Sequence, residues 1–224
     1  MSLPPNYQIT QLTPDHSDEL CDFLMSHFLL EEPLNRAAGM SRQSFEPFVE
    51  KLFHRTLHLP FSYAVRENDT LKIVACAMSS LWKNERGDEE HGGDEFVFES
   101  KKKEAISAIG KILTELHAKF YELRPELNAV LHLEILSVSK DHQRRGLASR
   151  LMEKMENVRK IHEFECSGVA SEISSLANQC LMRKRGYTTL HKVLLSTECD
   201  EASGEPLIVT DDGTDRVALV YKEF

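Results

Sequence analysis

One stretch, residues 131–162, constrains the fold of this chain more than any other, because it joins an apolar run to a helical pattern through a short polar loop. Residues 130–138 are mostly apolar, as expected of a buried strand. The helical stripe that follows consists of Leu147, Leu151, Met155 and Val158. The pattern therefore predicts a strand, a loop and an amphipathic helix in that order.

The loop between this strand and this helix carries Gln143-Arg144-Arg145-Gly146-Leu147-Ala148. A loop that opens a helix turns unpaired backbone N–H groups toward one point, where the helix dipole adds partial positive charge. The loop is thus a candidate seat for an anion, with a pyrophosphate as the first choice. The alternative is that Gly146 only permits a tight turn into the helix. The sequence contains neither GxxxxGK[ST] nor GxGxxG, so a P-loop and a Rossmann phosphate site are not expected.

The rest of the chain alternates irregularly between strand-like and helix-like patterns. Further strands are expected at residues 7–12, 61–66, 71–82, 166–170, 187–195, 207–210 and 217–222, the last two as a terminal hairpin. Helices are expected from 14 to about 32, over 45–53, from 101 to 125 and over 174–185. This order predicts a mixed α/β sheet. The residue before Pro33 is pushed out of the helical region, so Glu32 should lie at a helix-to-loop junction.

Length and charge limit the possible functions. A chain of 224 residues fits one domain, here 1–224, with a flexible acidic loop expected at 83–100 and a loop leading to the terminal hairpin at 196–216. A net charge of −9 argues against nucleic acid and leaves room for a cationic ligand. Five scattered cysteines favour reduced thiols and a cytoplasmic protein. Neither a signal peptide nor a membrane span is expected.

The strand, loop and helix, followed by Arg183-Lys184-Arg185-Gly186-Tyr187 at the end of a later helix, resemble the GNAT superfamily of N-acetyltransferases. Within it, Glu31-Glu32-Pro33-Leu34-Asn35 and Leu136-Ser137-Val138 look like the arylalkylamine N-acetyltransferases of the invertebrate type. The resemblance covers roughly residues 7–195. It implies a single-domain α/β fold with a mixed, mostly antiparallel sheet flanked by helices, and acetyl-CoA as co-substrate.

The resemblance also implies which residues hold acetyl-CoA. Superfamily members bind the pyrophosphate on backbone amides of the loop, and they pair the pantetheine arm with the end of the strand. The cofactor-binding residues implied in this way are Leu136, Ser137, Val138, Gln143, Arg144, Arg145, Gly146, Leu147 and Ala148. A side chain at Gly146 would block the approach of phosphate to the backbone. For Arg144 and Arg145, a solvent-facing role is the alternative, and no metal site is expected.

A protonated amine must lose a proton before it attacks a thioester, so the reaction needs a base. The resemblance places this base at Glu32; otherwise Glu32 is a solvated residue at the end of a helix. His132 and Glu134 share a face of the central strand and are rival bases; the alternative for them is a paired role or an exposed position at an edge.

The family's assisting serine pair maps onto Ser174 and Asn178. Ser174 is a catalytic candidate or a helix N-cap. Asn178 departs from the serine and is a candidate for binding the cofactor. The family's tyrosine acid maps onto Met182, so no general acid is evident.

Two functions from different classes follow. The first is an acetyl-CoA-dependent N-acetyltransferase that acts directly on a small primary amine, with an arylalkylamine favoured over polyamines and protein amines. The second is a non-catalytic acyl-CoA-binding module, which the missing serine and tyrosine suggest. Nothing in the sequence defines the acceptor or the oligomeric state.

Overall fold

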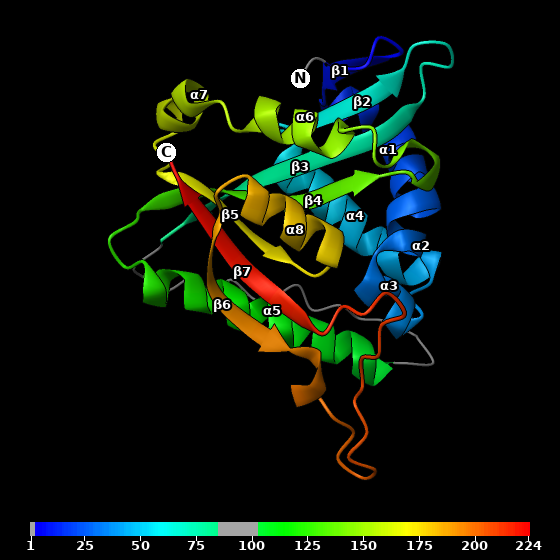
Figure 1. Cartoon of the computed structure of the whole chain (residues 1–224), viewed down its shortest axis with the longest axis vertical. Coiled ribbons are helices and arrows are strands. Elements are labelled where there is room, and N and C mark those ends of the chain that lie inside the picture. Colours follow the sequence, from blue (N-terminus) through cyan, green and yellow to red (C-terminus); the bar gives the residue numbers. More distant parts are fainter. Residues whose placement is uncertain (1–2, 85–102) are drawn as a thin grey trace.

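Seven strands form one mixed sheet in the computed structural model, which describes residues 3–84 and 103–224 (Figure 1). The strands are β1 (Tyr7–Gln11), β2 (Tyr63–Glu67), β3 (Ile73–Lys83), β4 (Ala129–Val138), β5 (Gly168–Ile173), β6 (Thr188–Leu194) and β7 (Arg216–Glu223). The helices are α1 (Ser17–Phe23), α2 (Leu29–Glu31), α3 (Pro33–Ala38), α4 (Arg42–Thr56), α5 (Lys103–Leu123), α6 (Leu147–Met155), α7 (Val158–Glu163) and α8 (Leu176–Lys184). The expected mixed, mostly antiparallel sheet flanked by helices is confirmed.

The strand order is β1-β2-β3-β4-β5-β7-β6. Only β4 and β5 pair in parallel among the described strands, and their register covers just Leu131 with Val169 and His132 with Ala170. Beyond these residues the two strands diverge toward their C-terminal ends (Figure 1). Within the described part of the chain, one edge of β4 therefore has no strand partner over its second half.

A β-bulge lies at the same place in β4. Ile135 pairs with Met78 and Leu133 with Ser79, which leaves Glu134 without a partner on β3. The extra residue shifts the alternation of side chains, so Leu133 and Leu136 belong to the same core cluster. It also turns the backbone groups of Leu136 toward the gap between β4 and β5.

Helices cover both faces of the sheet (Figure 1). On one face, α6 and α8 bury Leu147, Leu151, Met155 and Met182 in one cluster. On the other face, α1 and α4 pack over β2, β3 and β4, and α5 packs over β5, β6 and β7. The expected apolar stripe of the helix after the loop is confirmed up to Met155. Val158 is 43% exposed because the helix ends at Met155 and α7 begins in a new direction.

Other boundaries differ from expectation for local physical reasons. The helix expected from 14 to 32 is divided into α1, a π-helical segment (Leu24–Phe28) and α2. Glu32 ends it as expected, but α3 begins directly at Pro33, because the fixed φ of proline suits the first turn of a helix. The junction therefore connects two helices rather than a helix and a loop.

The expected terminal hairpin is wrong. Residues 207–210 form no strand, and β7 instead inserts between β5 and β6 and pairs with both. Since each of these neighbours supplies a full antiparallel ladder, β7 needs no hairpin partner. The strand expected at 166–170 is β5, shifted to Gly168–Ile173. The acidic loop expected at 83–100 lies outside the described residues, apart from its first two positions.

No helix within 3–84 or 103–224 has the length and apolar content that crossing a membrane requires.

Candidate active site

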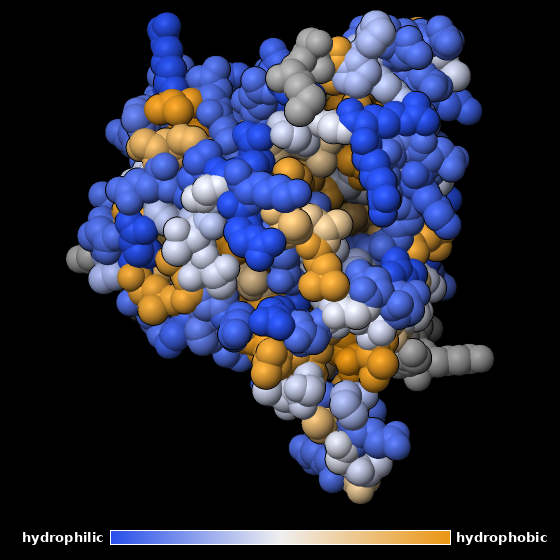
Figure 2. Space-filling model, viewed as in Figure 1, coloured by the Kyte–Doolittle hydropathy of each residue, from blue (hydrophilic) through white to orange (hydrophobic). Residues whose placement is uncertain are grey.

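A cavity of about 980 Å³ opens where β4 and β5 diverge, and it extends from the start of α6 to α2 and α3. Figure 2 shows this face of the molecule hollowed, with apolar side chains inside and hydrophilic ones around the opening. The cavity brings together most of the residues expected from the sequence. They are Glu32, Leu136, Ser137, Val138, Gln143, Arg144, Gly146, Leu147, Ala148, Ser174 and Asn178.

The loop before α6 has the geometry of an anion site. Gly146 is the N-cap of α6 with φ 79°, and Arg144 also has a left-handed backbone with φ 60°. A Cβ at Gly146 would meet nothing within 4 Å, so the space over its backbone is open. The first N–H groups of α6 have no partner within the helix and are directed at this space. These residues fit a pyrophosphate.

Arg145 does not line the cavity, in contrast to its neighbours. Its guanidinium donates to the Tyr7 hydroxyl at 2.7 Å and to the Asp141 carbonyl at 2.9 Å. These bonds hold the loop against β1 and direct the charge away from the open space. The Arg145 side chain therefore does not face the coenzyme site, and only its backbone can contribute there.

The unpaired edge of β4 is covered by side chains from three other segments. Ser171 Oγ donates to the Leu133 carbonyl at 2.8 Å. Asn178 Nδ2 donates to the Leu136 carbonyl at 3.2 Å, and Gln143 Nε2 donates to the Val138 carbonyl at 3.1 Å. Side chains thus donate the hydrogen bonds that a neighbouring strand would otherwise donate to the carbonyls of this edge. A ligand arm that runs along β4 would meet Gln143 and Asn178 in turn.

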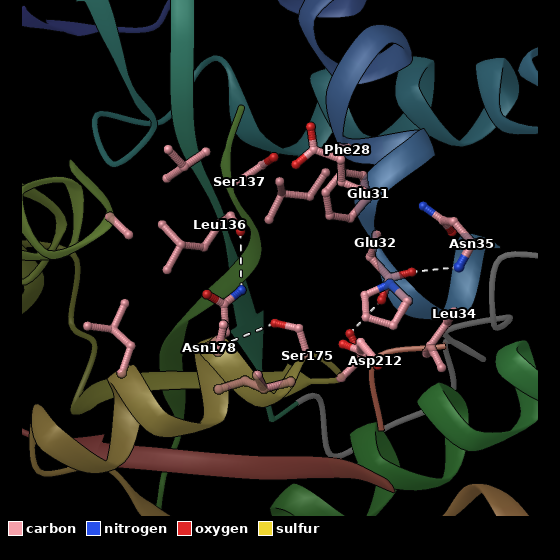
Figure 3. A pocket seen from close by; sticks show the side chains of 18 of the residues that line it. Phe28, Glu31, Glu32, Leu34, Asn35, Leu136, Ser137, Ser175, Asn178 and Asp212 are labelled. Atoms are coloured by element: carbon pink, nitrogen blue, oxygen red, sulfur yellow. Dashed lines mark hydrogen bonds between the residues drawn. The ribbon is translucent and has the colours of Figure 1, made fainter. Parts of the chain in front are cut away.

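Glu32 lies at the opposite end of the cavity, as the N-cap of α3 (Figure 3). Its Oε2 accepts from the Asn35 backbone N–H at 2.7 Å, and its Oε1 accepts from Ser174 Oγ at 2.6 Å. Burial raises the pKa of the Glu32 carboxyl above its ordinary value of 4.5, although the hydrogen bonds from Ser174 and Asn35 oppose the shift. A carboxylate with a raised pKa is a better proton acceptor near neutral pH.

The N-cap of α8 is Ser175, whose hydroxyl accepts from the Asn178 backbone N–H at 3.3 Å. Ser174 is therefore not the cap of this helix. Its hydroxyl is free to point across the cavity to Glu32, from the segment between β5 and α8. Two adjacent serines thus serve different purposes.

The rival bases are held in a buried ionic network. Glu134 accepts from Arg55 Nε at 2.7 Å and from Ser80 Oγ at 2.6 Å, and it lies 3.4 Å from His132 Nδ1. The other ring nitrogen of His132 lies 2.7 Å from a carboxylate oxygen of Glu172. His132 and Glu134 do share a face, as the strand pattern predicted.

This network makes both rivals poor proton acceptors. Burial alone would raise the pKa of Glu134, but His132 and Arg55 outweigh it and hold that pKa well below its ordinary value. Burial alone would lower the pKa of His132, but Glu172 and Glu134 raise it to about 9. Glu134 is therefore a weak base, and His132 already carries a proton at neutral pH.

Residues that the sequence did not single out complete the end of the cavity around Glu32. An apolar wall is formed by Phe28, Met40, Phe45, Phe48, Ile106, Ile109 and Leu113. Helical spacing had assigned Phe45 and Phe48 to a buried face, and spacing alone does not distinguish the wall of a cavity from a closed core.

Carboxylates line the same end of the cavity. Asp211 and Asp212 reach it from the segment before β7, where Asp211 forms an ion pair with Arg36 of α3. Asp212 accepts from the Thr214 N–H at 3.0 Å. Only the folded chain brings this segment to α3, because 175 positions separate Arg36 from Asp211.

Comparisons with known proteins agree with this geometry. A model of the acetyltransferase (GNAT) family matches residues 24–187. The structure is similar to arylalkylamine N-acetyltransferase 2 from Aedes aegypti, with a TM-score of 0.83 and 20% identity over 97% of this chain and 99% of that chain.

Two other similar structures are of acetyltransferases described with different substrates. One is a mutant agmatine N-acetyltransferase without ligand, with a TM-score of 0.74 and 18% identity over 98% of this chain and 100% of that chain. The other is a Drosophila melanogaster polyamine N-acetyltransferase, with a TM-score of 0.71 and 19% identity over 97% and 100%. No curated protein matches the sequence. At these identities the similarity establishes the fold and leaves the substrate open.

Proposed function

This chain belongs to the acetyltransferase (GNAT) family, and from that premise we propose that it transfers an acetyl group from acetyl-CoA directly to a small primary amine. The observation that carries the proposal is the Glu32 carboxylate, which lies in the same cavity as the open N-terminus of α6. Such a transfer needs an anion-binding site for the coenzyme and a proton acceptor for the amine, and the cavity has one at each end. The whole chain acts as one domain in this proposal.

Acetyl-CoA, when bound, supplies an acetyl group activated as a thioester. We assign its pyrophosphate to the backbone of Gln143–Ala148, with Arg144 adding charge at the rim. Its arm follows the edge of β4 at Leu136, Ser137 and Val138, past Asn178. The open space over Gly146 supports this assignment, because a ligand can approach the backbone closely there.

Glu32 is the general base in this proposal. It takes a proton from the ammonium group, directly or through a water, so that the amine nitrogen regains the lone pair that attacks the acetyl carbon. The Ser174 hydroxyl and the Asn35 N–H hold the carboxylate in place during that step. The protein binds both reactants at once and forms no covalent intermediate.

An arylalkylamine is the favoured acceptor. The apolar wall of Phe28, Phe45 and Phe48 suits a ring, because aromatic groups bury large areas and stack on one another. The carboxylate of Asp212 favours a cation at the same end of the cavity, whereas that of Asp211 is already paired with Arg36. Asp212 also supports the second candidate, a polyamine or a protein amine, whose additional cation it would attract. We place the reaction in the cytoplasm, as the scattered free cysteines suggest.

The substitution Glu32→Gln tests the assigned base. We expect kcat/KM for an amine to fall by roughly 10²- to 10³-fold near pH 7, because general-base catalysis contributes about this much. The defect should shrink as the pH approaches the amine pKa of about 10, where the free amine no longer needs a base. Initial rates of CoA release between these two pH values measure it.

One outcome would contradict the assigned base, and another would contradict the function. A larger neutral-pH defect in Glu134→Gln than in Glu32→Gln would assign the base to β4. Acetyl-CoA binding by calorimetry without thiol release for any arylalkylamine, polyamine or lysine peptide would make the chain a binding module instead of an enzyme.

A further inference from the structure

The wall of the cavity beside β4 lacks a typical acid for the leaving sulfur. No tyrosine and no cysteine lines the cavity among the described residues, and Met182 of α8 is one of its lining residues. His142 also lines the cavity, but its ring nitrogens lie 2.9 Å from Ser139 Oγ and 3.5 Å from a carboxylate oxygen of Glu67. Of the serines that line the cavity near this wall, Ser171 donates to the Leu133 carbonyl, Ser174 donates to Glu32, and Ser137 lies on β4 beside Leu136. The polar group that α8 extends to β4 is the side-chain amide of Asn178.

Asn178 lies between the two ends of the cavity. Figure 3 shows it beside Leu136 on one side of the hollow, with Glu32 on the other side. An arm that starts at the α6 loop and follows β4 passes Val138 and then Leu136 before it reaches Glu32. The reactive end of this arm must therefore pass within reach of Asn178.

A bound ligand would replace the Asn178 amide as the hydrogen-bond donor to the Leu136 carbonyl. Asn178 Nδ2 donates to the Leu136 carbonyl at 3.2 Å, on the edge of β4 that has no strand partner. A ligand that pairs with this edge satisfies the carbonyl and releases the amide. The amide keeps its place in the wall, because the Asn178 backbone is fixed in the first turn of α8 by its bond to Ser175.

We propose that the Asn178 amide donates a hydrogen bond to the coenzyme sulfur and stabilises it as a thiolate when the acetyl group leaves. The proposal rests on the proposed function. The amine nitrogen forms the bond to the acetyl carbon, and the carbon–sulfur bond breaks with its electron pair remaining on sulfur. Glu32 passes the ammonium proton on to water before the attack and then accepts the second nitrogen proton, which leaves when the amide forms. A carboxamide donates hydrogen bonds but gives up no proton at neutral pH, so the thiolate takes its proton from water after release.

The test compares CoA with desulfo-CoA, which has the same arm but lacks the sulfur. Dissociation constants are measured by calorimetry from about pH 7 to about pH 9.5, a range that spans an ordinary thiol pKa. For the unchanged protein, we expect CoA to gain affinity over desulfo-CoA as the thiol ionises. In Asn178→Ala this gain should fall by roughly tenfold, the usual effect of one hydrogen bond to a charged group. In Asn178→Asp, whose side chain has the same shape as asparagine, the gain of CoA affinity over desulfo-CoA should disappear, because a carboxylate repels the thiolate.

Gln143→Ala is the matched control, since Gln143 is the other side-chain amide that donates to a β4 carbonyl. It should weaken both coenzymes equally at every pH. If Asn178→Ala weakens the binding of CoA and of desulfo-CoA equally, the proposal is overturned. Asn178 would then contact the arm of the coenzyme or support β4, and not the sulfur. If the unchanged protein binds neither coenzyme, the proposed function itself fails, and the two failures are thus distinguishable.

Discussion

The Glu32 carboxylate is held by donors of two different origins. The Asn35 N–H lies three residues further along the chain, and the Ser174 hydroxyl comes from 142 positions away. Hydrogen bonds to a carboxylate lower its pKa, whereas burial raises it. The net rise at Glu32 is therefore a balance that single substitutions can shift.

Removing one donor should move this balance in a known direction. Ser174→Ala deletes a hydrogen bond that favours the charged form, so the pKa of Glu32 should rise further. We expect the acidic limb of the kcat/KM profile to move to higher pH, with activity on the alkaline side largely retained. Steady-state rates with a single amine across the pH range measure the shift.

The neighbouring serine provides the control for this prediction. Ser175 caps α8 and does not contact Glu32, so Ser175→Ala should lower stability by about 1 kcal/mol and leave the limb where it is. Equal shifts in the two variants would mean that the Glu32–Ser174 bond does not set the pKa.

Sequence reasoning reached these residues to different extents. Pro33 identifies Glu32 as the end of a helix, because proline restricts the residue before it. The contact of Glu32 with Ser174 could not be predicted from spacing, since it depends on how β5 and α8 are placed in the sheet. The choice between Glu32, His132 and Glu134 remained open for the same reason: Arg55, Ser80 and Glu172 approach β4 from other elements.

At the scale of elements, the site depends on a strand pair that separates. The apolar run predicted β4, and the stripe at Leu147 and Leu151 predicted α6. The divergence of β4 and β5 leaves no such trace in the sequence, because it depends on the bulge at Glu134 and on the short parallel register. The loop and helix could thus be predicted as an anion site, whereas the cavity beside them could not.

The Gly146 N-cap of α6 gives a prediction at this scale. In Gly146→Ala, the left-handed backbone should cost about 1 kcal/mol of stability, because an L side chain is strained there. The new Cβ would also fill the open space that we assign to phosphate. We expect CoA affinity to fall by roughly tenfold or more, measured by calorimetry beside urea unfolding.

Gly186 separates the two effects of this substitution. It has φ 86°, and a Cβ there also meets nothing within 4 Å, but it follows α8 and does not line the cavity. Gly186→Ala should therefore lose similar stability and keep its CoA affinity. A comparable loss of affinity in both variants would indicate that strain, rather than a blocked phosphate, is responsible.

At the scale of the whole molecule, local patterns predicted the mixed sheet but not its full order. Residues 207–210 have a strand-like composition, yet they lie in the segment that carries Asp211 to Arg36. The place of β7 between β5 and β6 is a long-range pairing. Such pairings depend on which neighbours are free, which a local pattern does not specify.

The buried network around His132 links α4, β3, β4 and β5, and it should make the stability of the whole fold depend on pH. His132 stacks on Trp82 with ring centroids 3.8 Å apart, between the carboxylates of Glu134 and Glu172. Its pKa is about 9 in the folded protein and 6.5 ordinarily. A pKa raised by folding adds stability that is complete below about pH 6.5 and is lost as the pH rises through about 9.

We therefore compare the free energy of unfolding of the unchanged protein with that of His132→Gln. The difference between the two should decrease as the pH rises from about 6.5 to about 9, by at most about 3 kcal/mol. Urea unfolding at several pH values measures it, with His58→Gln as a control because His58 is exposed. A difference that stays constant with pH would show that the buried imidazole is neutral. Because His132 does not line the cavity, CoA affinity below pH 6.5 should be the same in both proteins. A pH-dependent loss of stability with unchanged affinity would show that the His132 imidazole supports the sheet rather than coenzyme binding.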